Sequence, residues 1–124
     1  MGKVIMVIDD AAAIRQSVGY SLQEAGFDVV EAVHGEDALK KLKSLNVDLI
    51  VCDVNMPVMD GITFLKKIKN EEEYSAFRFT PIIMLTTEAG QDSKEEGKKS
   101  GAKVWMVKPF KPEQLIDVVK KLIH

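Results

Sequence analysis

The sequence contains a single cysteine, Cys52, among its 124 residues. An internal disulfide is therefore impossible, and this cysteine content is typical of proteins from a reducing compartment. Because Cys52 lies inside an apolar run, we expect it to be a small core residue rather than a reactive thiol. The sequence predicts a cytoplasmic protein.

Long apolar segments, excess charge and clustered histidines are also lacking. The apolar runs, including the one that follows Met1-Gly2-Lys3, are too short for a signal peptide or a membrane span. The net charge of -2 gives no general attraction to nucleic acid or to an anionic membrane. His34 has no second ligand at a metal-binding spacing, so we assign it a structural role.

The remaining composition, 46% hydrophobic and 29% charged, is that of an ordinary globular protein and fits one domain over residues 1–124, which we expect to be monomeric. Five short apolar runs predict strands at 4–8, 28–32, 48–52, 81–85 and 103–107. Between and after them, helical patterns occupy 14–25, 38–45, 62–68, 91–100 and 112–123, with Pro112 at a helix-start position. The pattern at 91–100 has almost no apolar stripe, which fits either a movable element or a solvated surface helix.

Strands that alternate strictly with helices predict an α/β fold, a doubly wound five-stranded parallel sheet with helices on both faces. Right-handed crossovers place the carboxyl ends of all five strands along one edge of such a sheet. The polar residues that follow four of the strands should therefore lie close together: Asp9, Asp10, Asp53, Asn55, Thr86, Thr87 and Lys108.

This set of residues predicts a metal-binding site at which a phosphoryl group is transferred to an aspartate. Three crowded carboxylates repel one another, and oxygen ligands without clustered His or Cys favour Mg²⁺ over zinc. Asp53 follows an apolar run at 49–52, where a carboxylate is costly to desolvate, and a carboxylate nucleophile can form an aspartyl phosphate. Lys108 and the metal would offset the charge of the incoming phosphoryl group, and the Thr86 hydroxyl could donate a hydrogen bond to it.

Several of these residues have simpler structural interpretations. Asp10 could cap the first helix, and we expect Asp60 to be a turn or cap residue before the third. Thr86 or Lys108 alone would be an ordinary turn or surface residue, and it is their occurrence together with the acids that points to a site. In the connection at 70–80, we favour packing against the sheet over a partner-binding patch for its three aromatic residues, Tyr74, Phe77 and Phe79.

Two other functional classes fit the sequence less well. A phosphohydrolase that uses Asp53 on external substrates would carry a general acid two residues later, and Asn55 cannot serve as one. A flavodoxin-like nucleotide binder would have a glycine-rich phosphate loop after the first strand, where Asp9 and Asp10 stand instead.

Five segments of the chain resemble landmarks of the response-regulator receiver domain: VIDD at 7–10, VCDVNMPVMDG at 51–61, MLTTE at 84–88, SGA at 100–102 and VKPF at 107–110. The resemblance covers essentially the whole chain. It implies the strand order 2-1-3-4-5 and a cis bond between Lys108 and Pro109.

The resemblance also implies a role for each site residue. Asp53 matches the phosphoacceptor, Asp9 and Asp10 match the acidic pair that binds Mg²⁺, and Asn55 would add its backbone carbonyl. Thr86 matches the switch hydroxyl, Lys108 the phosphate-binding lysine and Trp105 the switch aromatic residue. Asn55 and Glu88 match positions associated with the rate of aspartyl phosphate hydrolysis.

Without an attached effector domain, the chain is similar to the single-domain, CheY-like chemotaxis receivers. That similarity implies a CheA-like histidine kinase as phosphoryl donor, an output protein such as the flagellar motor switch and, as an optional third partner, a phosphatase. The chain itself would be a phosphoacceptor rather than an enzyme. The alternative within the family is an intermediate of a phosphorelay, which passes the phosphoryl group to another histidine.

Overall fold

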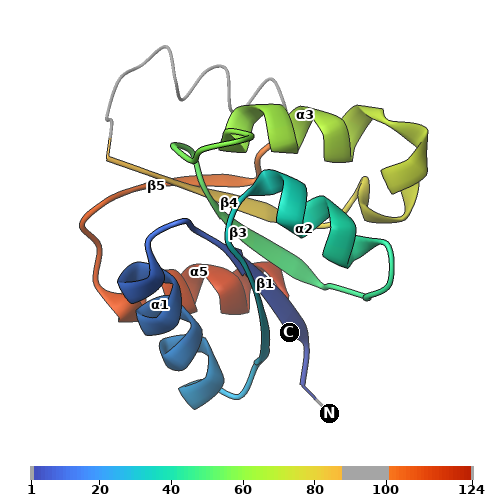
Figure 1. Cartoon of the computed structure of the whole chain (residues 1–124). Coiled ribbons are helices and arrows are strands. Elements are labelled where there is room, and N and C mark those ends of the chain that lie inside the picture. Colours follow the sequence, from blue (N-terminus) through green and yellow to red (C-terminus); the bar gives the residue numbers. More distant parts are fainter. Residues whose placement is uncertain (1, 88–100, 124) are drawn as a thin grey trace.

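The computed structural model describes residues 2–87 and 101–123, which contain one five-stranded sheet (Figure 1). The strands are β1 (Val4–Ile8), β2 (Asp28–Ala32), β3 (Leu49–Asp53), β4 (Ile82–Thr86) and β5 (Val104–Val107). All are parallel, in the order β2-β1-β3-β4-β5, which confirms the predicted topology. The predicted helix at 91–100 and Glu88 lie outside the described residues.

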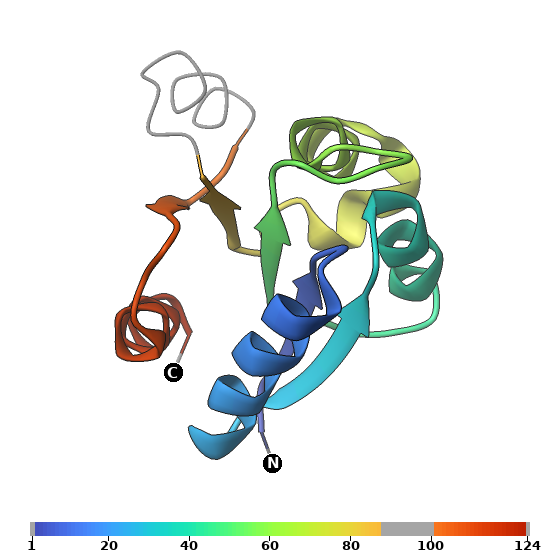
Figure 2. The same cartoon turned by 60° about the vertical axis from the view of Figure 1, so that its left-hand side comes forward.

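The helices cover both faces of the sheet. They are α1 (Ala12–Glu24), α2 (Gly35–Leu42), α3 (Gly61–Asn70), the 3₁₀ helix η1 (Glu72–Phe77) and α5 (Pro112–Leu122). Figures 1 and 2 show α1 and α5 on one side of the strands and α2 and α3 on the other. No helix within residues 2–87 and 101–123 combines the length and the apolar character needed to cross a membrane.

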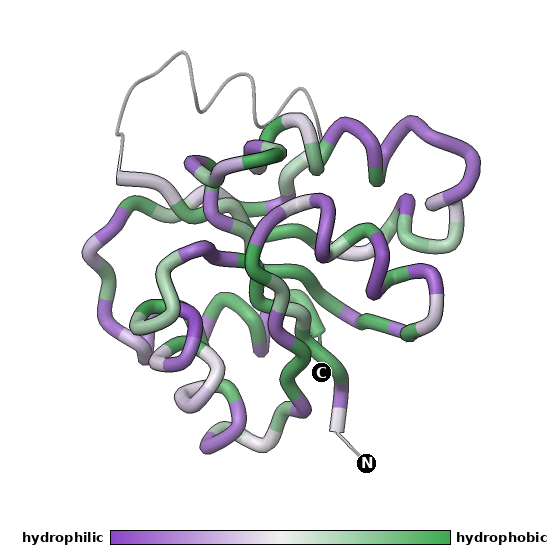
Figure 3. The backbone as a smooth tube through the Cα atoms, in the orientation of Figure 1, coloured by the Kyte–Doolittle hydropathy of each residue, from purple (hydrophilic) through white to green (hydrophobic). Residues whose placement is uncertain are grey.

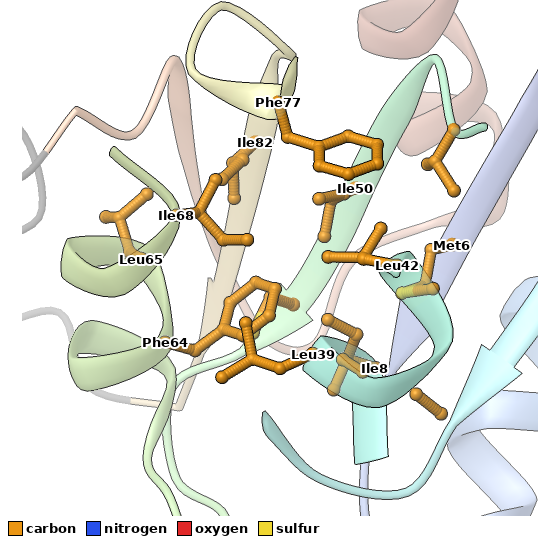
Figure 4. Packing of buried hydrophobic residues seen from close by; sticks show 14 of the residues in the cluster. Met6, Ile8, Leu39, Leu42, Ile50, Phe64, Leu65, Ile68, Phe77 and Ile82 are labelled. Atoms are coloured by element: carbon orange, nitrogen blue, oxygen red, sulfur yellow. The ribbon is translucent and has the colours of Figure 1, made fainter. Parts of the chain in front are cut away.

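Two hydrophobic clusters form, one on each face, because successive residues of a strand point to opposite sides. In β1, Ile5 and Val7 pack with α1 and α5, whereas Met6 and Ile8 pack with α2, α3 and η1. The three central strands, β1, β3 and β4, are therefore apolar without alternation up to the site residues at their ends, as is typical of a sheet buried on both faces. Figure 3 shows the hydrophobic stretches running along these strands, and Figure 4 shows the second cluster around Phe64.

Side chains that precede the helices set where two of them begin. His34 caps α2, since its Nδ1 accepts a hydrogen bond from the Asp37 backbone N–H at 3.1 Å, so the helix starts at Gly35. Helix α2 therefore begins and ends three residues earlier than the predicted 38–45, and Leu45 lies beyond its end and is exposed. Asp60 caps α3 as predicted, with Oδ1 accepting from the Thr63 N–H at 2.7 Å.

The connection between α3 and β4 contains a helix that the sequence pattern did not predict. Tyr74 and Phe77 of η1 are buried in the cluster around Phe64, so their predicted packing role is confirmed. Phe79 is 92% exposed, and the packing role predicted for it is wrong. It stands in a loop that Lys69 holds by donating to the carbonyl oxygens of Arg78 and Thr80.

Candidate functional site

Three carboxylates meet at the carboxyl edge of the sheet. Asp9 and Asp10 follow β1 and Asp53 ends β3, and one ligand oxygen from each lies within 4.8 Å of the others. Asp9 and Asp53 are buried, whereas Asp10 is exposed. The parallel pairing of β1 with β3 brings these acids together, as the topology predicted, although Asp9 and Asp10 precede Asp53 by 44 and 43 positions in the chain.

Asp10 does not cap the first helix. The N-cap of α1 is Ala11, which makes no side-chain cap hydrogen bond. Its neighbour Asp9 instead accepts a hydrogen bond from the Ala11 N–H through Oδ1 at 2.9 Å. The capping interpretation of Asp10 is therefore wrong, which leaves its carboxylate available to a ligand at the sheet edge.

Lys108 lies between two of the carboxylates. Its Nζ is 3.3 Å from Asp9 Oδ2 and 3.2 Å from Asp53 Oδ1, and the lysine side chain is only 13% exposed. The Lys108 N–H also donates to the Thr86 carbonyl at 2.6 Å, which places the lysine at the end of β5 directly beside β4. The bond to Pro109 is cis, as the resemblance implied.

The surroundings of Asp53 make its charged form less favourable than it is in water. Burial raises the pKa of Asp53 above its ordinary value of 3.8, Lys108 lowers it again, and the charge on Asp9 adds to the increase. A carboxylate whose charge is so poorly solvated favours a bound cation, and Lys108 offers one positive charge to two acids. The site is thus suited to a divalent cation in addition to the lysine.

The other predicted site residues lie around this centre. Thr86 ends β4 and is fully buried, one residue beyond Leu85, which is paired in register with Asp53. Trp105 is half-buried in β5 opposite Met84 and packs on the cluster around Phe64. Its indole Nε1 is buried and has no hydrogen-bond partner within the described part of the chain. Asn55 is exposed in the loop after β3.

The loop that carries Asn55 is fixed at both ends. The Val54 N–H donates to the Leu85 carbonyl at 2.9 Å, and the Gly61 N–H donates back to the Val54 carbonyl at 2.8 Å. Gly61 was not among the predicted site residues, yet a Cβ there would overlap the Asp53 carbonyl oxygen. Only glycine lets the start of α3 approach the acceptor strand this closely.

Cys52 confirms its predicted place in the core. It is fully buried, and burial together with the charge on Asp53 raises the pKa of its thiol well above the ordinary value. The thiol therefore stays protonated and unreactive at neutral pH.

Comparisons with known proteins agree with this geometry. A model of the response regulator receiver domain matches residues 5–120. Protein PilG of Pseudomonas aeruginosa is 38% identical over 119 residues, which are 96% of this chain and 86% of PilG. The structure of the chemotaxis protein CheY4 of Vibrio cholerae superposes with a TM-score of 0.90 at 42% identity, covering 99% of this chain and 100% of that one.

A third relative bears on the metal. The receiver domain of the sensor histidine kinase PA1611 from Pseudomonas aeruginosa has a magnesium ion coordinated in its active-site cleft. It is 27% identical to this chain with a TM-score of 0.87, covering 99% of this chain and 98% of that domain. The donor set here, three carboxylates with no histidine or cysteine in the group, has the hard oxygen character that Mg²⁺ requires.

Proposed function

Because the chain belongs to the response regulator receiver family, we propose that it is a Mg²⁺-dependent phosphoacceptor with Asp53 as the residue phosphorylated. The observation that carries this proposal is the buried Asp53 carboxylate, grouped with Asp9 and Asp10 and in contact with Lys108. The carboxylates of Asp9, Asp10 and Asp53 and the backbone carbonyl of Asn55 would hold the metal. When bound, Mg²⁺ supplies charge that stabilises the phosphoryl oxygens.

The step itself is a phosphoryl transfer between two side chains. An Asp53 carboxylate oxygen attacks the phosphorus of a phosphohistidine on the donor, so that an O–P bond forms as the N–P bond breaks. The donor imidazole keeps the electron pair and takes up a proton. Lys108, already 3.2 Å from Asp53 Oδ1, then pairs with a phosphoryl oxygen.

The new charge at the sheet edge provides the signal. The Thr86 hydroxyl donates to the phosphoryl group, and Trp105 on the neighbouring strand adjusts its packing in response. Asn55 and Glu88 set how fast the aspartyl phosphate is hydrolysed. The protein is thus a switch that accepts one phosphoryl group per chain and acts in the cytoplasm, not an enzyme that turns over external substrates.

Acetyl phosphate tests the acceptor chemistry without a partner protein. Incubated with acetyl phosphate and Mg²⁺, the protein is expected to gain the mass of at most one phosphoryl group, measured by intact mass spectrometry. An excess of EDTA should abolish this gain, because the crowded acids no longer receive a neutralising cation. Labelling that is equally fast in EDTA would contradict the metal requirement. Steady release of phosphate from small phosphate esters would contradict a switch that accepts one phosphoryl group per chain.

We further propose that the output is chemotactic, with a CheA-like kinase as donor and a flagellar motor switch protein as receiver of the signal. The similarity to the chemotaxis protein CheY4 supports this assignment. Beryllofluoride, a phosphoryl mimic, is expected to tighten binding to a purified motor switch protein by about tenfold, measured by calorimetry. Equal affinity with and without the mimic would contradict the motor switch protein as partner. It would not affect the proposal that Asp53 is phosphorylated.

A further inference from the structure

Arg15, in the first part of α1, links two strand ends through one guanidinium group. Its Nη1 donates to the Asp9 backbone carbonyl at 2.8 Å, and its Nε donates to Glu31 Oε1 of β2 at 2.9 Å. The Arg15 side chain is only 13% exposed, whereas Glu31 is 44% exposed. Arg15 was not predicted from the sequence, because no residue spacing along the chain indicates that a helical side chain contacts the end of a strand.

The carbonyl that Arg15 holds belongs to the peptide bond between the two acids that follow β1. The same backbone is fixed at two further points: the Asp9 N–H donates to the Ala32 carbonyl at 3.2 Å, and Asp9 Oδ1 accepts from the Ala11 N–H at 2.9 Å. Asp10 is exposed, so its direction depends on this backbone rather than on packing. A rotation of the Asp9–Asp10 peptide would turn one acid away from Asp53.

We propose that Arg15 is a positioning residue for the metal site: it fixes the Asp9–Asp10 peptide so that both carboxylates face the same cation as Asp53, and Glu31 orients its guanidinium. The inference rests on the proposed function, since it assigns a residue to the same Mg²⁺ site. Partners that orient metal ligands typically contribute a factor of about 10 to 100 in metal affinity.

A simple charge effect would act in the opposite direction. Arg15 is a positive charge near a cation site, so its removal should strengthen Mg²⁺ binding if charge alone mattered. Positioning predicts that its removal weakens binding. Arg15→Lys separates the two further, because lysine keeps the charge but lacks the planar fork that reaches both partners.

The test measures Mg²⁺ affinity by isothermal titration calorimetry for Arg15→Gln, Arg15→Lys and Glu31→Gln. We expect about tenfold weaker binding for Arg15→Gln, a smaller loss for Arg15→Lys and a loss of a few-fold for Glu31→Gln. The control is Lys67→Gln, which breaks the surface ion pair between Lys67 of α3 and Glu71, 3.0 Å long, and should leave the affinity unchanged.

Two further measurements separate positioning from other effects. Urea unfolding in EDTA reports any loss of stability in the metal-free fold, and labelling by acetyl phosphate at saturating Mg²⁺ should return to the native rate in Arg15→Gln. Mg²⁺ affinity within twofold of the native value, or tighter, in Arg15→Gln overturns the inference. If instead the native protein binds Mg²⁺ but never labels, the proposed function fails and the role of Arg15 in the metal site can still be judged.

Discussion

Asp53→Asn is expected to abolish phosphoryl labelling while making the metal-free protein more stable. The amide has no nucleophilic carboxylate oxygen, so acetyl phosphate should leave the mass of the variant unchanged even with Mg²⁺. The same change removes a buried negative charge that lies beside Asp9 and keeps an oxygen for Lys108. We expect the free energy of unfolding in EDTA to rise by about 1 to 2 kcal/mol at pH 7, as when a strained functional group is removed.

The stability gained by Asp53→Asn should depend on pH. The pKa of Asp53 is raised in the folded state, so the folded protein binds this proton more tightly than the unfolded chain does. The resulting stabilisation is complete below the ordinary value of 3.8 and is lost as the pH rises through the higher folded value. Urea unfolding in EDTA across this range should therefore show the advantage of Asp53→Asn growing as the pH rises.

Asp60→Asn is the matched control for this experiment. It makes the same chemical change in the loop after β3, where asparagine caps a helix as well as aspartate does. Its labelling and its stability should stay close to those of the native protein. Magnesium-dependent labelling of Asp53→Asn at the native level would refute Asp53 as the acceptor, and an unchanged or lower stability would refute the electrostatic account.

Gly61→Ala is expected to destabilise the protein by about 3 kcal/mol and to slow labelling of Asp53. The added methyl group would overlap the Asp53 carbonyl oxygen and lie 2.9 Å from Val54 Cα, and both neighbours are backbone atoms that cannot rotate away. To remove this overlap, α3 must move away from the end of β3. That movement loses packing contacts and displaces Asp53. Urea unfolding and the rate of acetyl phosphate labelling measure the two effects.

Gly19→Ala supplies the comparison within the same chain. Gly19 lies inside α1, and a Cβ there would make an ordinary contact of 3.4 Å with Val29. Because alanine favours a helix over glycine by about 1 kcal/mol, this variant should be as stable as the native protein or more so. If the two alanine variants had similar stabilities, the close approach of α3 to Asp53 would not be the constraint described here.

The sequence predicted the sheet and the grouping of the acids with Lys108 well, because both depend on strong local patterns. The apolar run before Asp53 predicted β3 to within one residue, and parallel topology alone placed Asp9, Asp53 and Lys108 at one edge. Hydrophobic runs and strand ends are local signals, and the rules that connect parallel strands add the long-range part.

Features that depend on tertiary contacts were not predicted. The charged stretch around Glu72 concealed η1, since a short 3₁₀ helix has no clear apolar period. Phe77 and Phe79 are the same residue type only two positions apart, yet Phe77 is buried and Phe79 is exposed to solvent. The roles of Gly61 and Arg15 arise from close approaches between elements, which residue spacing does not encode.

The ion pairs of Lys108 span 99 residues to Asp9 and 55 residues to Asp53. The site therefore exists only when β1, β3 and β5 have been joined through β4, and contacts between such distant parts of a chain slow folding. A chain still emerging from the ribosome, with β5 not yet made, would hold Asp53 without its lysine. Until β5 has joined the sheet, Asp53 lacks the cation that pairs with it in the folded protein.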